Sequence, residues 1–245
     1  LQPLIDSVNS AITSQGIEEK NVNFYLLATA GMRVISPVLQ KNIYRQLKKY
    51  IKENTDFKTE EITTIPGKHE GAFDWIAYNY LAKKLFTDKT MGILDMGGAS
   101  VEIAFATNKP IFNPGDKVEF MIGAKKFTIF SHSYLGLGQN LAISQYTNDS
   151  CCFPKGYPLP NEMTGSGEFK IALLKIENLV NVVHNVNKPS TIIPDADKFV
   201  GVSGFYYTPT SKPFGLGQNI SIKALKARGT NFGQRPWADS EKRYS

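Results

Sequence analysis

Cysteine and histidine are scarce in this chain, which contains two cysteines and three histidines among its 245 residues. Cys151 and Cys152 are adjacent, and a disulfide between neighbouring residues would be strained. No second histidine or cysteine stands at a metal-ligand spacing from His69, so we interpret His69 as a polar residue of a turn. The remaining candidates for chemistry are carboxylates, hydroxyls and glycine-rich turns.

Long apolar runs and concentrated basic blocks are also missing. No run of about eighteen apolar residues occurs, so we expect no membrane-spanning segment in this chain. The net charge is +6, but the basic residues are scattered and the aromatic residues fall within expected strands and helices. A nucleic-acid-binding module is therefore the least favoured function. An apolar share of 42% and a charged share of 20% are ordinary for a globular soluble protein.

The most informative segment runs from Met91 to Phe105. An apolar run ends at Asp95, and Gly97, Gly98 and Ser100 then lead into a second, alternating apolar run. This pattern predicts two strands joined by a tight turn, in which consecutive N–H groups cradle a phosphate. Asp95 can hold a divalent cation beside it, directly or through water. The alternative is an ordinary Gly-Gly hairpin turn without a ligand.

A second segment places a hydroxyl and a cation after a strand. Phe24 to Leu27 is an apolar run, and Thr29 and Arg33 lie in the turn that follows it. Ser36 and Pro37 are typical of a helix start, and apolar residues recur beyond them at helical spacing. Because ligands of α/β sheets bind beyond the strand ends, Thr29 and Arg33 are candidate site residues. A salt bridge or a helix-start contact is the alternative for Arg33.

A third segment places a carboxylate before an aromatic-rich helix. Pro66 and Gly67 break a short strand, and Glu70 follows in the turn. A carboxylate at this position can serve as a general base. Its alternative role is to stabilise the helix start through the helix dipole.

Together these segments resemble the apyrase family, the ecto-nucleoside triphosphate diphosphohydrolases. The similar stretches occur in the family's order along the chain: ATAGMR (28–33), GKHEGAFDWIAYNY (67–80), DMGGASVEI (95–103), SYLGLGQNLA (133–142), CFPKGY (152–157) and GVSGFYY (201–207). The resemblance implies an actin-like, sugar-kinase-like (ribonuclease H-like) two-lobe α/β fold. It also implies hydrolysis of nucleoside tri- and diphosphates to the monophosphate, with Ca²⁺ or Mg²⁺ as cofactor.

The resemblance also implies roles for individual residues. Glu70 would be the catalytic base and Asp95 would hold the metal through its water shell. Ser100 and Glu102 would position the attacking water, with the Thr29 hydroxyl near it. Phosphate would be bound by Gly97, Gly98, Ala99, Ser100 and Arg33. Tyr207 would stack on the nucleobase.

Three departures from the family pattern are visible. The family's opening Asp-x-Gly-Ser phosphate loop is not found, and the chain stops soon after GVSGFYY, so we expect a fragment with weak activity or none. Glu102 stands where the family usually has glutamine, and a further carboxylate near Glu70 and Asp95 would raise a pKa there.

The family's cysteine at Cys152 often pairs with a downstream cysteine, which this chain lacks. Free thiols, or a partner outside the chain, remain the two possibilities.

We expect residues 1–87 to form part of a first lobe, residues 88–207 the second lobe, and residues 208–245 a segment with weak periodicity. In the second lobe we expect a hairpin around Gly123, helices over 138–146 and 169–185, and a strand over 198–207. The resemblance implies a secreted, exported or luminal protein, and it leaves the oligomeric state open. The alternatives are an impaired nucleotide-binding or interaction protein, or another phosphotransferase or exopolyphosphatase of the actin-like superfamily.

Overall fold

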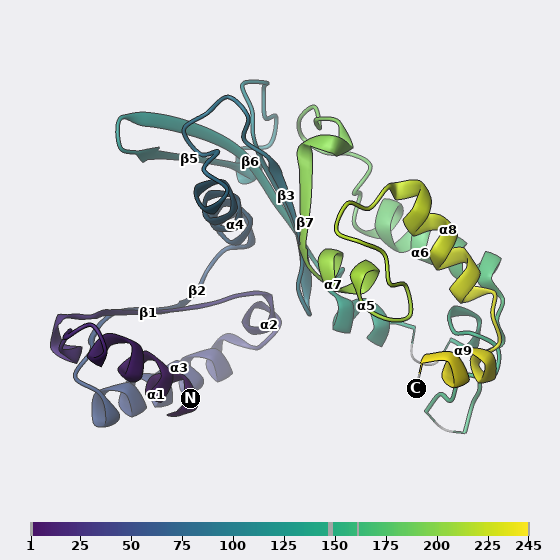
Figure 1. The fold of residues 1–245 in the computed structure, drawn as a ribbon, viewed down its shortest axis with the longest axis horizontal. Helices are drawn as coiled ribbons and strands as arrows, with labels where there is room; N and C mark the ends of the chain where they lie inside the picture. Colours follow the sequence, from purple (N-terminus) through teal and green to yellow (C-terminus); the bar gives the residue numbers. More distant parts are fainter. Residues whose placement is uncertain (1, 147–148, 161, 245) are drawn as a thin grey trace. The chain divides into compact units, whose positions relative to one another are not determined.

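The computed structural model describes residues 2–146, 149–160 and 162–244, and the chain divides into two compact units, residues 1–66 and 67–245 (Figure 1). The lobe boundary expected near residue 87 falls inside the second unit, between its first helix and the following strand. The predicted boundary at residue 87 separates the two lobes of the fold, which are not the same as these two units, and it stays a prediction. Among the described helices, none has the length and apolar character needed to cross a bilayer.

The first unit is built on two parallel strands, β1 (Asn23–Ala28) and β2 (Lys58–Thr64). They are connected through a short helix, α2 (Ala30–Arg33), and a long one, α3 (Pro37–Asn54). Ser36 caps α3, since its hydroxyl accepts a hydrogen bond from the N–H of Leu39, which confirms the predicted helix start. The N-terminal helix α1 (Gln2–Thr13) lies on the same side of the strand pair as α3 (Figure 1).

The second unit contains a five-stranded sheet in the order β5-β6-β4-β3-β7. Its strands are β3 (Gly92–Met96), β4 (Ser100–Ala106), β5 (Lys117–Ile122), β6 (Lys125–Leu135) and β7 (Phe199–Ser203). Strands β3 and β7 are parallel, and the other neighbours are antiparallel. The hairpin predicted around Gly123 is confirmed, and this glycine has a φ of +59° in the turn.

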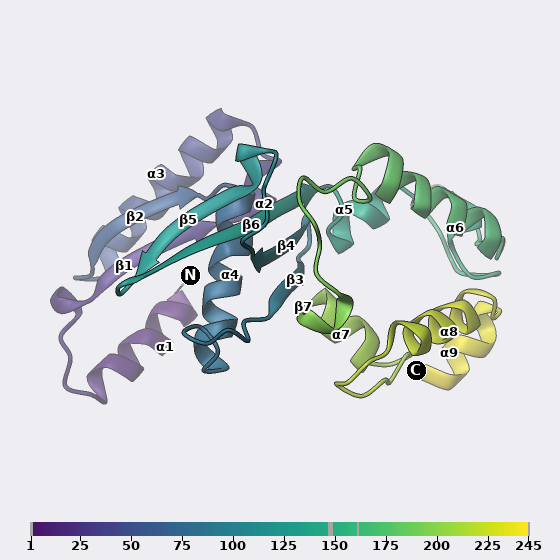
Figure 2. The ribbon, with the colours of Figure 1, turned by 90° about the horizontal axis from the view of Figure 1, so that it is seen from above.

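Helix α4 (Gly67–Leu81) packs on one face of this sheet, as Figure 2 shows. Trp75 of α4 is fully buried, and its ring meets that of Phe127 on β6 edge-on, with centroids 5.5 Å apart. The core between them consists of Ala72, Trp75, Leu85, Ala104, Val118, Phe127 and Ile129. The buried Asn79 side chain bonds both the N–H and the carbonyl of Met91, which ties the end of α4 to the start of β3.

The opposite face of the sheet carries an apolar cavity of about 540 Å³ lined by sheet and helix residues. Helices α5 (Gln139–Ser144) and α6 (Phe169–Asn178) supply its far side. A π-helical turn over Leu179–Val183 continues α6, so the predicted helix over 169–185 is irregular at its end. Thus the sheet is covered by α4 on one face and by α5 and α6 on the other.

Two segments differ from the sequence-based expectation. The strand expected over 198–207 ends at Ser203, and the aromatic residues that follow lie in helix α7 (Gly204–Thr210). The segment 208–245 contains two helices, α8 (Ile222–Gly233) and α9 (Trp237–Tyr244). Trp237 packs edge-on against Tyr157, with ring centroids 4.8 Å apart. This contact joins residues eighty positions apart, which periodicity does not reveal.

Candidate active site

Three carboxylates from three elements converge in the second unit. Glu70 lies in the first turn of α4, Asp95 on β3 and Glu102 on β4, and one oxygen of each lies within 4.8 Å of the others. Asp95 and Glu102 are directly opposite in the antiparallel ladder, so their side chains share one face of the sheet. The structure therefore brings together three of the residues singled out from the sequence.

Gly71 allows α4 to approach this face closely. A Cβ atom at Gly71 would lie 2.7 Å from the hydroxyl of Ser131 and 3.3 Å from the Cβ of Glu102. A side chain here would force Ser131 and Glu102 to shift, so glycine allows the closest approach of the helix to strands β4 and β6. This close approach places Glu70, one residue earlier, beside the carboxylates of the sheet.

Glu102 is fully buried and is held by two hydroxyls. Its Oε1 atom accepts hydrogen bonds from Ser100 at 2.5 Å and from Ser133 at 2.6 Å. Ser133 lies opposite Glu102 on β6, so Asp95, Glu102 and Ser133 form a row across three strands. Ser100, predicted as a site residue, thus belongs to the carboxylate network, and Ser133 joins it from the SYLGLGQNLA stretch.

Asp74 is a fourth carboxylate in the cluster, and the sequence analysis missed it. Burial, followed by the negative charges of Asp95 and Glu102, raises the pKa of Asp74 from 3.8 to about 7. Asp74 is four residues after Glu70, a spacing that puts both side chains on one side of α4. The four-residue spacing from Glu70 was the signal in the sequence that could have identified Asp74.

The donors in this cluster fit a hard divalent cation. The Oδ2 atom of Asp74 and the Oδ1 atom of Asp95 are buried, and within the described residues no N–H group or hydroxyl donates to them. Carboxylate oxygens are the ligands that Ca²⁺ and Mg²⁺ prefer. A cation would also relieve the mutual repulsion of the four acids, so the residues present are compatible with the predicted cofactor.

The glycine turn between β3 and β4 is clamped by the start of α5. The carbonyl of Gly97 accepts a hydrogen bond from the N–H of Gln139, and that of Gly98 accepts one from the N–H of Asn140, at 2.9 and 2.8 Å. A Cβ atom at Gly138 would lie 2.3 Å from the backbone nitrogen of Ala99, so glycine is required there. The turn is thereby fixed by a segment forty residues downstream.

One of the expected phosphate donors is used within this turn. The N–H of Gly97 donates to the carbonyl of Ser100 at 3.0 Å. Gly98 is exposed and Ala99 is nearly buried. Of the three N–H groups expected to bind phosphate, the one at Gly97 therefore already has a partner in the hairpin.

The turn between β7 and α7 lies beside the end of β3. Ser203 pairs with Met96 in the parallel ladder, and a Cβ atom at Gly204 would lie 2.9 Å from the Met96 carbonyl oxygen. Ser203 is exposed and has φ +50° and ψ −123°, a conformation that non-glycine residues rarely adopt. This strain was not predictable from the sequence, because the GVSGFYY stretch predicts a strand that continues through residue 207.

Three further predicted residues lie on α7 or in the first unit. Tyr207 is on α7 with 65% of its surface exposed, and its ring meets that of Tyr206 edge-on. Thr29 immediately precedes α2 and Arg33 ends it, so both belong to the first unit. The carboxylate cluster and the clamped glycine turn belong to the second unit alone.

Comparison with known proteins gives consistent sequence matches. A model of the GDA1/CD39 (nucleoside phosphatase) family matches residues 1–155. Nucleoside-triphosphatase ntp-1 of Caenorhabditis elegans is 29% identical over 98% of this chain and 50% of its own length. Golgi apyrase of Schizosaccharomyces pombe is 34% identical over 89% of this chain and 44% of its own length. The chain thus spans about half the length of these curated relatives.

A solved structure agrees at the level of the fold. The Aquifex aeolicus member of the Ppx/GppA protein family superposes with a TM-score of 0.51 and 16% identity, covering 99% of this chain and 64% of its own. This likeness concerns the fold alone, and it confirms the predicted actin-like α/β class. The apyrase resemblance is confirmed by the family model and by the named relatives. Because the family model covers more than half of the residues of this chain, the chain belongs to the GDA1/CD39 (nucleoside phosphatase) family.

Proposed function

We propose that the intact protein hydrolyses nucleoside tri- and diphosphates to the monophosphate, with a water molecule as nucleophile. The observation that carries the proposal is the convergence of Glu70, Asp95 and Glu102 beside the clamped glycine turn. Phosphoryl transfer requires mainly positioning and charge stabilisation, and a turn of N–H groups next to acids provides both. The names of the relatives, nucleoside-triphosphatase and apyrase, support the same reaction class.

Glu70 is the proposed general base. It is half-buried on the first turn of α4, whereas Glu102 is fully buried and accepts two hydroxyl hydrogen bonds. Glu102 is therefore better placed to orient groups than to take up a proton. Ser100, held by Glu102, would position the attacking water, and Glu70 would accept its proton. A base of this kind contributes about 10²–10⁴-fold to the rate.

Phosphate binding is assigned to the N–H groups of Gly98 and Ala99. Gly97 contributes through its backbone conformation, since its own N–H is bonded to Ser100. Donors fixed before the substrate arrives stabilise the developing negative charge without reorganisation, and each is worth about 3 kcal/mol in measured cases. The clamp from Gln139 and Asn140 keeps these donors in place.

Asp95 is the proposed residue for holding Ca²⁺ or Mg²⁺ through water, with Asp74 close enough to share the water shell. A bound cation would supply neutralisation of the phosphate charge. Glu102 in place of the family's glutamine adds negative charge to this region. The preference between the two cations is therefore expected to depend on Glu102.

Three further residues have proposed roles in binding the substrate. The exposed ring of Tyr207 would stack on the nucleobase, an interaction worth about 1–3 kcal/mol that tolerates every base. Thr29 and Arg33, in the first unit, keep the roles that the resemblance implies, a hydroxyl that acts on the water and a cation that binds phosphate. The relatives include a Golgi apyrase, which supports a luminal or secreted location.

A substrate panel in isotopically labelled water tests the reaction class. The intact protein would be incubated with ATP, ADP or inorganic polyphosphate in ¹⁸O-water, with Ca²⁺ or Mg²⁺, and the released phosphate analysed by mass spectrometry. Release from both nucleotides with one ¹⁸O atom per phosphate is expected. Release from polyphosphate alone would favour an exopolyphosphatase, and nucleotide binding without release would favour an impaired binding protein. Either result would overturn the proposal.

A further inference from the structure

The connection between α7 and α8 carries a sequence motif that the proposed reaction does not use. Asn219, Ile220 and Ser221 form an Asn-x-Ser tripeptide in which x is not proline, and this is the acceptor pattern for an N-linked glycan. The chain contains one other such tripeptide, which begins at Asn148. The structure describes the whole of the tripeptide at Asn219, whereas Asn148 lies outside the described residues.

Asn219 lies at the surface, outside the helices and strands. It stands in a bend of the connection between Thr210, the last residue of α7, and Ile222, the first residue of α8. Its side chain is exposed, and among the described residues none forms a hydrogen bond with its amide group. Because a glycan is bulky and must project into water, this position is suitable for one.

The neighbouring glycines show that there is open space around this bend. A Cβ atom added at Gly215 or at Gly217 would meet no heavy atom within 4 Å. In contrast, a Cβ atom at Gly201 on β7 or at Gly204 at the start of α7 would lie 2.8 or 2.3 Å from its nearest neighbour. The chain is therefore tightly packed up to the start of α7 and loosely surrounded where it approaches Asn219.

The residues on both sides of Asn219 are held in place. Gln218 donates a hydrogen bond from its Nε2 atom to the hydroxyl of Tyr206 on α7, at 3.4 Å. Ser221 is the N-cap of α8, and its hydroxyl accepts a hydrogen bond from the N–H of Ala224 at 3.1 Å. Asn219 thus projects from a bend that is anchored to both helices, so a glycan attached to it would disturb neither.

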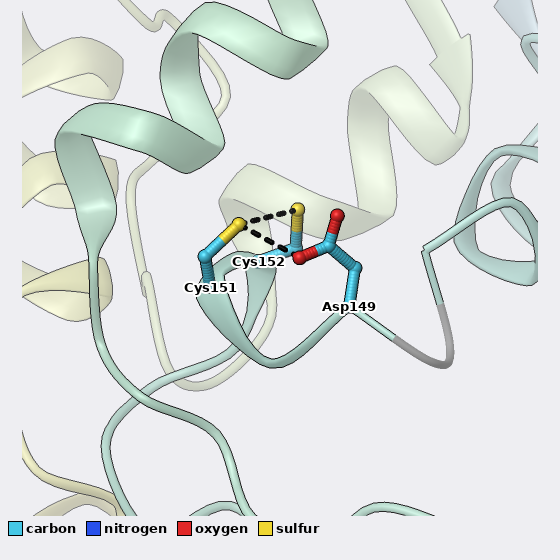
Figure 3. Close-up of side chains that lie close together, drawn as sticks. All are labelled: Asp149, Cys151 and Cys152. Carbon is cyan, nitrogen blue, oxygen red and sulfur yellow. Dashed lines mark hydrogen bonds between the residues drawn. The ribbon is translucent and has the colours of Figure 1, made fainter.

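The other tripeptide has a different setting. Asp149, its second residue, accepts a hydrogen bond from the Sγ atom of Cys151 at 2.9 Å, as Figure 3 shows. The other carboxylate oxygen of Asp149 is bonded to the ammonium group of Lys175 on α6. Ser150 begins a 3₁₀ turn, Ser150–Cys152, in which Cys151 is buried. This tripeptide therefore leads directly into packed structure, unlike the one at Asn219.

We propose that Asn219 carries an N-linked glycan in the intact protein. The proposal rests on the proposed luminal or secreted location, because the transfer takes place in the lumen of the secretory pathway. The donor is a lipid-linked diphospho-oligosaccharide, in which the bond between the anomeric carbon and the phosphate oxygen breaks. A bond from that carbon to the Nδ2 atom of Asn219 forms, Nδ2 loses one proton, and the lipid diphosphate leaves with the electron pair of the broken bond.

A glycan at Asn219 would determine how this surface is used. Because glycans are bulky and hydrophilic, the connection between α7 and α8 would stay in water and would not be buried against a partner protein. The glycan would also shield Ile222, three residues away, whose side chain is 70% exposed. None of the carboxylates proposed for hydrolysis belongs to this segment, so the glycan and the reaction can be tested separately.

Isotope labelling of the glycosylated asparagine tests the proposal. The intact protein would be expressed at full length in a eukaryotic host and treated with peptide N-glycosidase F in ¹⁸O-water, which converts a glycosylated asparagine to an ¹⁸O-labelled aspartate. Peptide mass spectrometry should find the label at Asn219. It should find none at Asn108, which lies in another exposed bend but is followed two positions later by proline. An unlabelled Asn219 would overturn the proposal, whatever the state of Asn148.

Variants separate the acceptor motif from the helix cap at Ser221. Ser221→Asp removes the hydroxyl of the motif but keeps an oxygen that can cap α8, so the glycan at Asn219 should be lost. Ser221→Thr keeps both the hydroxyl and the cap, and it should remain glycosylated. Asn219→Gln should gain mobility on a denaturing gel by the loss of one glycan, whereas the control Asn108→Gln should not. Unchanged mobility of Asn219→Gln would contradict the assignment.

The labelling experiment uses the parent protein, so it decides the question even where a variant fails to fold. It also needs no nucleotide hydrolysis. A labelled Asn219 in a protein that releases no phosphate would overturn the proposed function and leave the glycan assignment intact. Phosphate release by a protein with an unlabelled Asn219 would do the reverse.

Discussion

Asp95 on β3 and Glu102 on β4 are directly opposite each other in an antiparallel ladder, and both side chains face helix α4. Two acids in such a pair repel each other, which costs stability unless hydroxyls, protons or a cation compensate. Ser100 and Ser133 compensate at Glu102, and the raised pKa of Asp74 indicates a proton at that carboxyl. The arrangement has the electrostatic character of a functional site rather than of a structural core.

Replacing Glu102 by glutamine should preserve nucleotide hydrolysis. The amide oxygen of glutamine can still accept from Ser100 and Ser133, so the network that positions water is retained. Removal of a negative charge should also lower the pKa of Asp74 toward its ordinary value, since Glu102 contributes to the shift. Phosphate release and the carboxyl titration by NMR check the two effects. Complete loss of activity would show that the Glu102 charge takes part in the reaction.

Replacing Asp74 by asparagine should flatten the dependence of stability on pH. The pKa of Asp74 is about 7 in the folded protein and 3.8 when unperturbed, so between these values folding takes up a proton. Because the folded state then binds more protons than the unfolded state, the free energy of unfolding falls as pH rises through this window. We expect Asp74 to account for about 1–2 kcal/mol of that fall, after allowance for its partial exposure.

Urea unfolding of the metal-free protein, at several pH values between about 4 and about 7, measures this difference. Carboxylates outside the cluster contribute equally to the parent and to Asp74→Asn, so the comparison reports Asp74 together with its coupling to Asp95 and Glu102. Parallel stability curves for the two proteins would contradict the assigned pKa.

Replacing Gly138 by alanine should disrupt the clamp on the glycine turn. The added Cβ atom would lie 2.3 Å from the nitrogen of Ala99, so α5 or the turn must shift. We expect a loss of about 1–3 kcal/mol in the free energy of unfolding, together with weaker nucleotide binding. Gly217→Ala is the matched control, since a Cβ atom there meets nothing within 4 Å. Similar stability of both variants in denaturant titration would mean that the clamp is not required.

Replacing Ser203 by glycine should stabilise the fold. Glycine adopts φ +50° without the steric penalty that Ser203 bears, and such strain is worth about 1–3 kcal/mol. We expect a gain of about 1 kcal/mol, because glycine also loses more backbone entropy on folding. Ser203→Ala, which keeps the strain, is the control for loss of the hydroxyl. A gain in Ser203→Ala equal to that in Ser203→Gly would show that the backbone is not strained.

Local signals allowed part of this structure to be predicted from the sequence. The strand–turn–strand at residues 91–105 was predictable because apolar alternation and Gly97-Gly98 are contained within fifteen residues. The start of α3 followed from Ser36 and Pro37. Glu70 was predicted to lie in the turn before the helix, because Pro66 and Gly67 mark a boundary. In the structure α4 begins at Gly67 and includes Glu70.

Features that depend on tertiary packing could not be predicted in the same way. The inclusion of Asp74 in the cluster depends on the rotation of α4 against the sheet, which Gly71 permits. The positive φ of Ser203 occurs in the turn where Gly204 packs against Met96, and no local sequence signal marks it. Lys175 is twenty-six residues from Asp149, so no spacing pattern connects it to the carboxylate that it bonds.

The central claim is that Glu70 serves as the base in metal-dependent nucleotide hydrolysis. The most direct measurement compares phosphate release from ATP and ADP by the parent protein, Glu70→Gln and the surface control Asp88→Asn, with Ca²⁺ or Mg²⁺ and with chelator. With the intact protein as parent, we expect release from both nucleotides by the parent and the control, loss of release with chelator, and a fall of about 10²–10⁴-fold in Glu70→Gln. Undiminished release by Glu70→Gln would contradict the central claim.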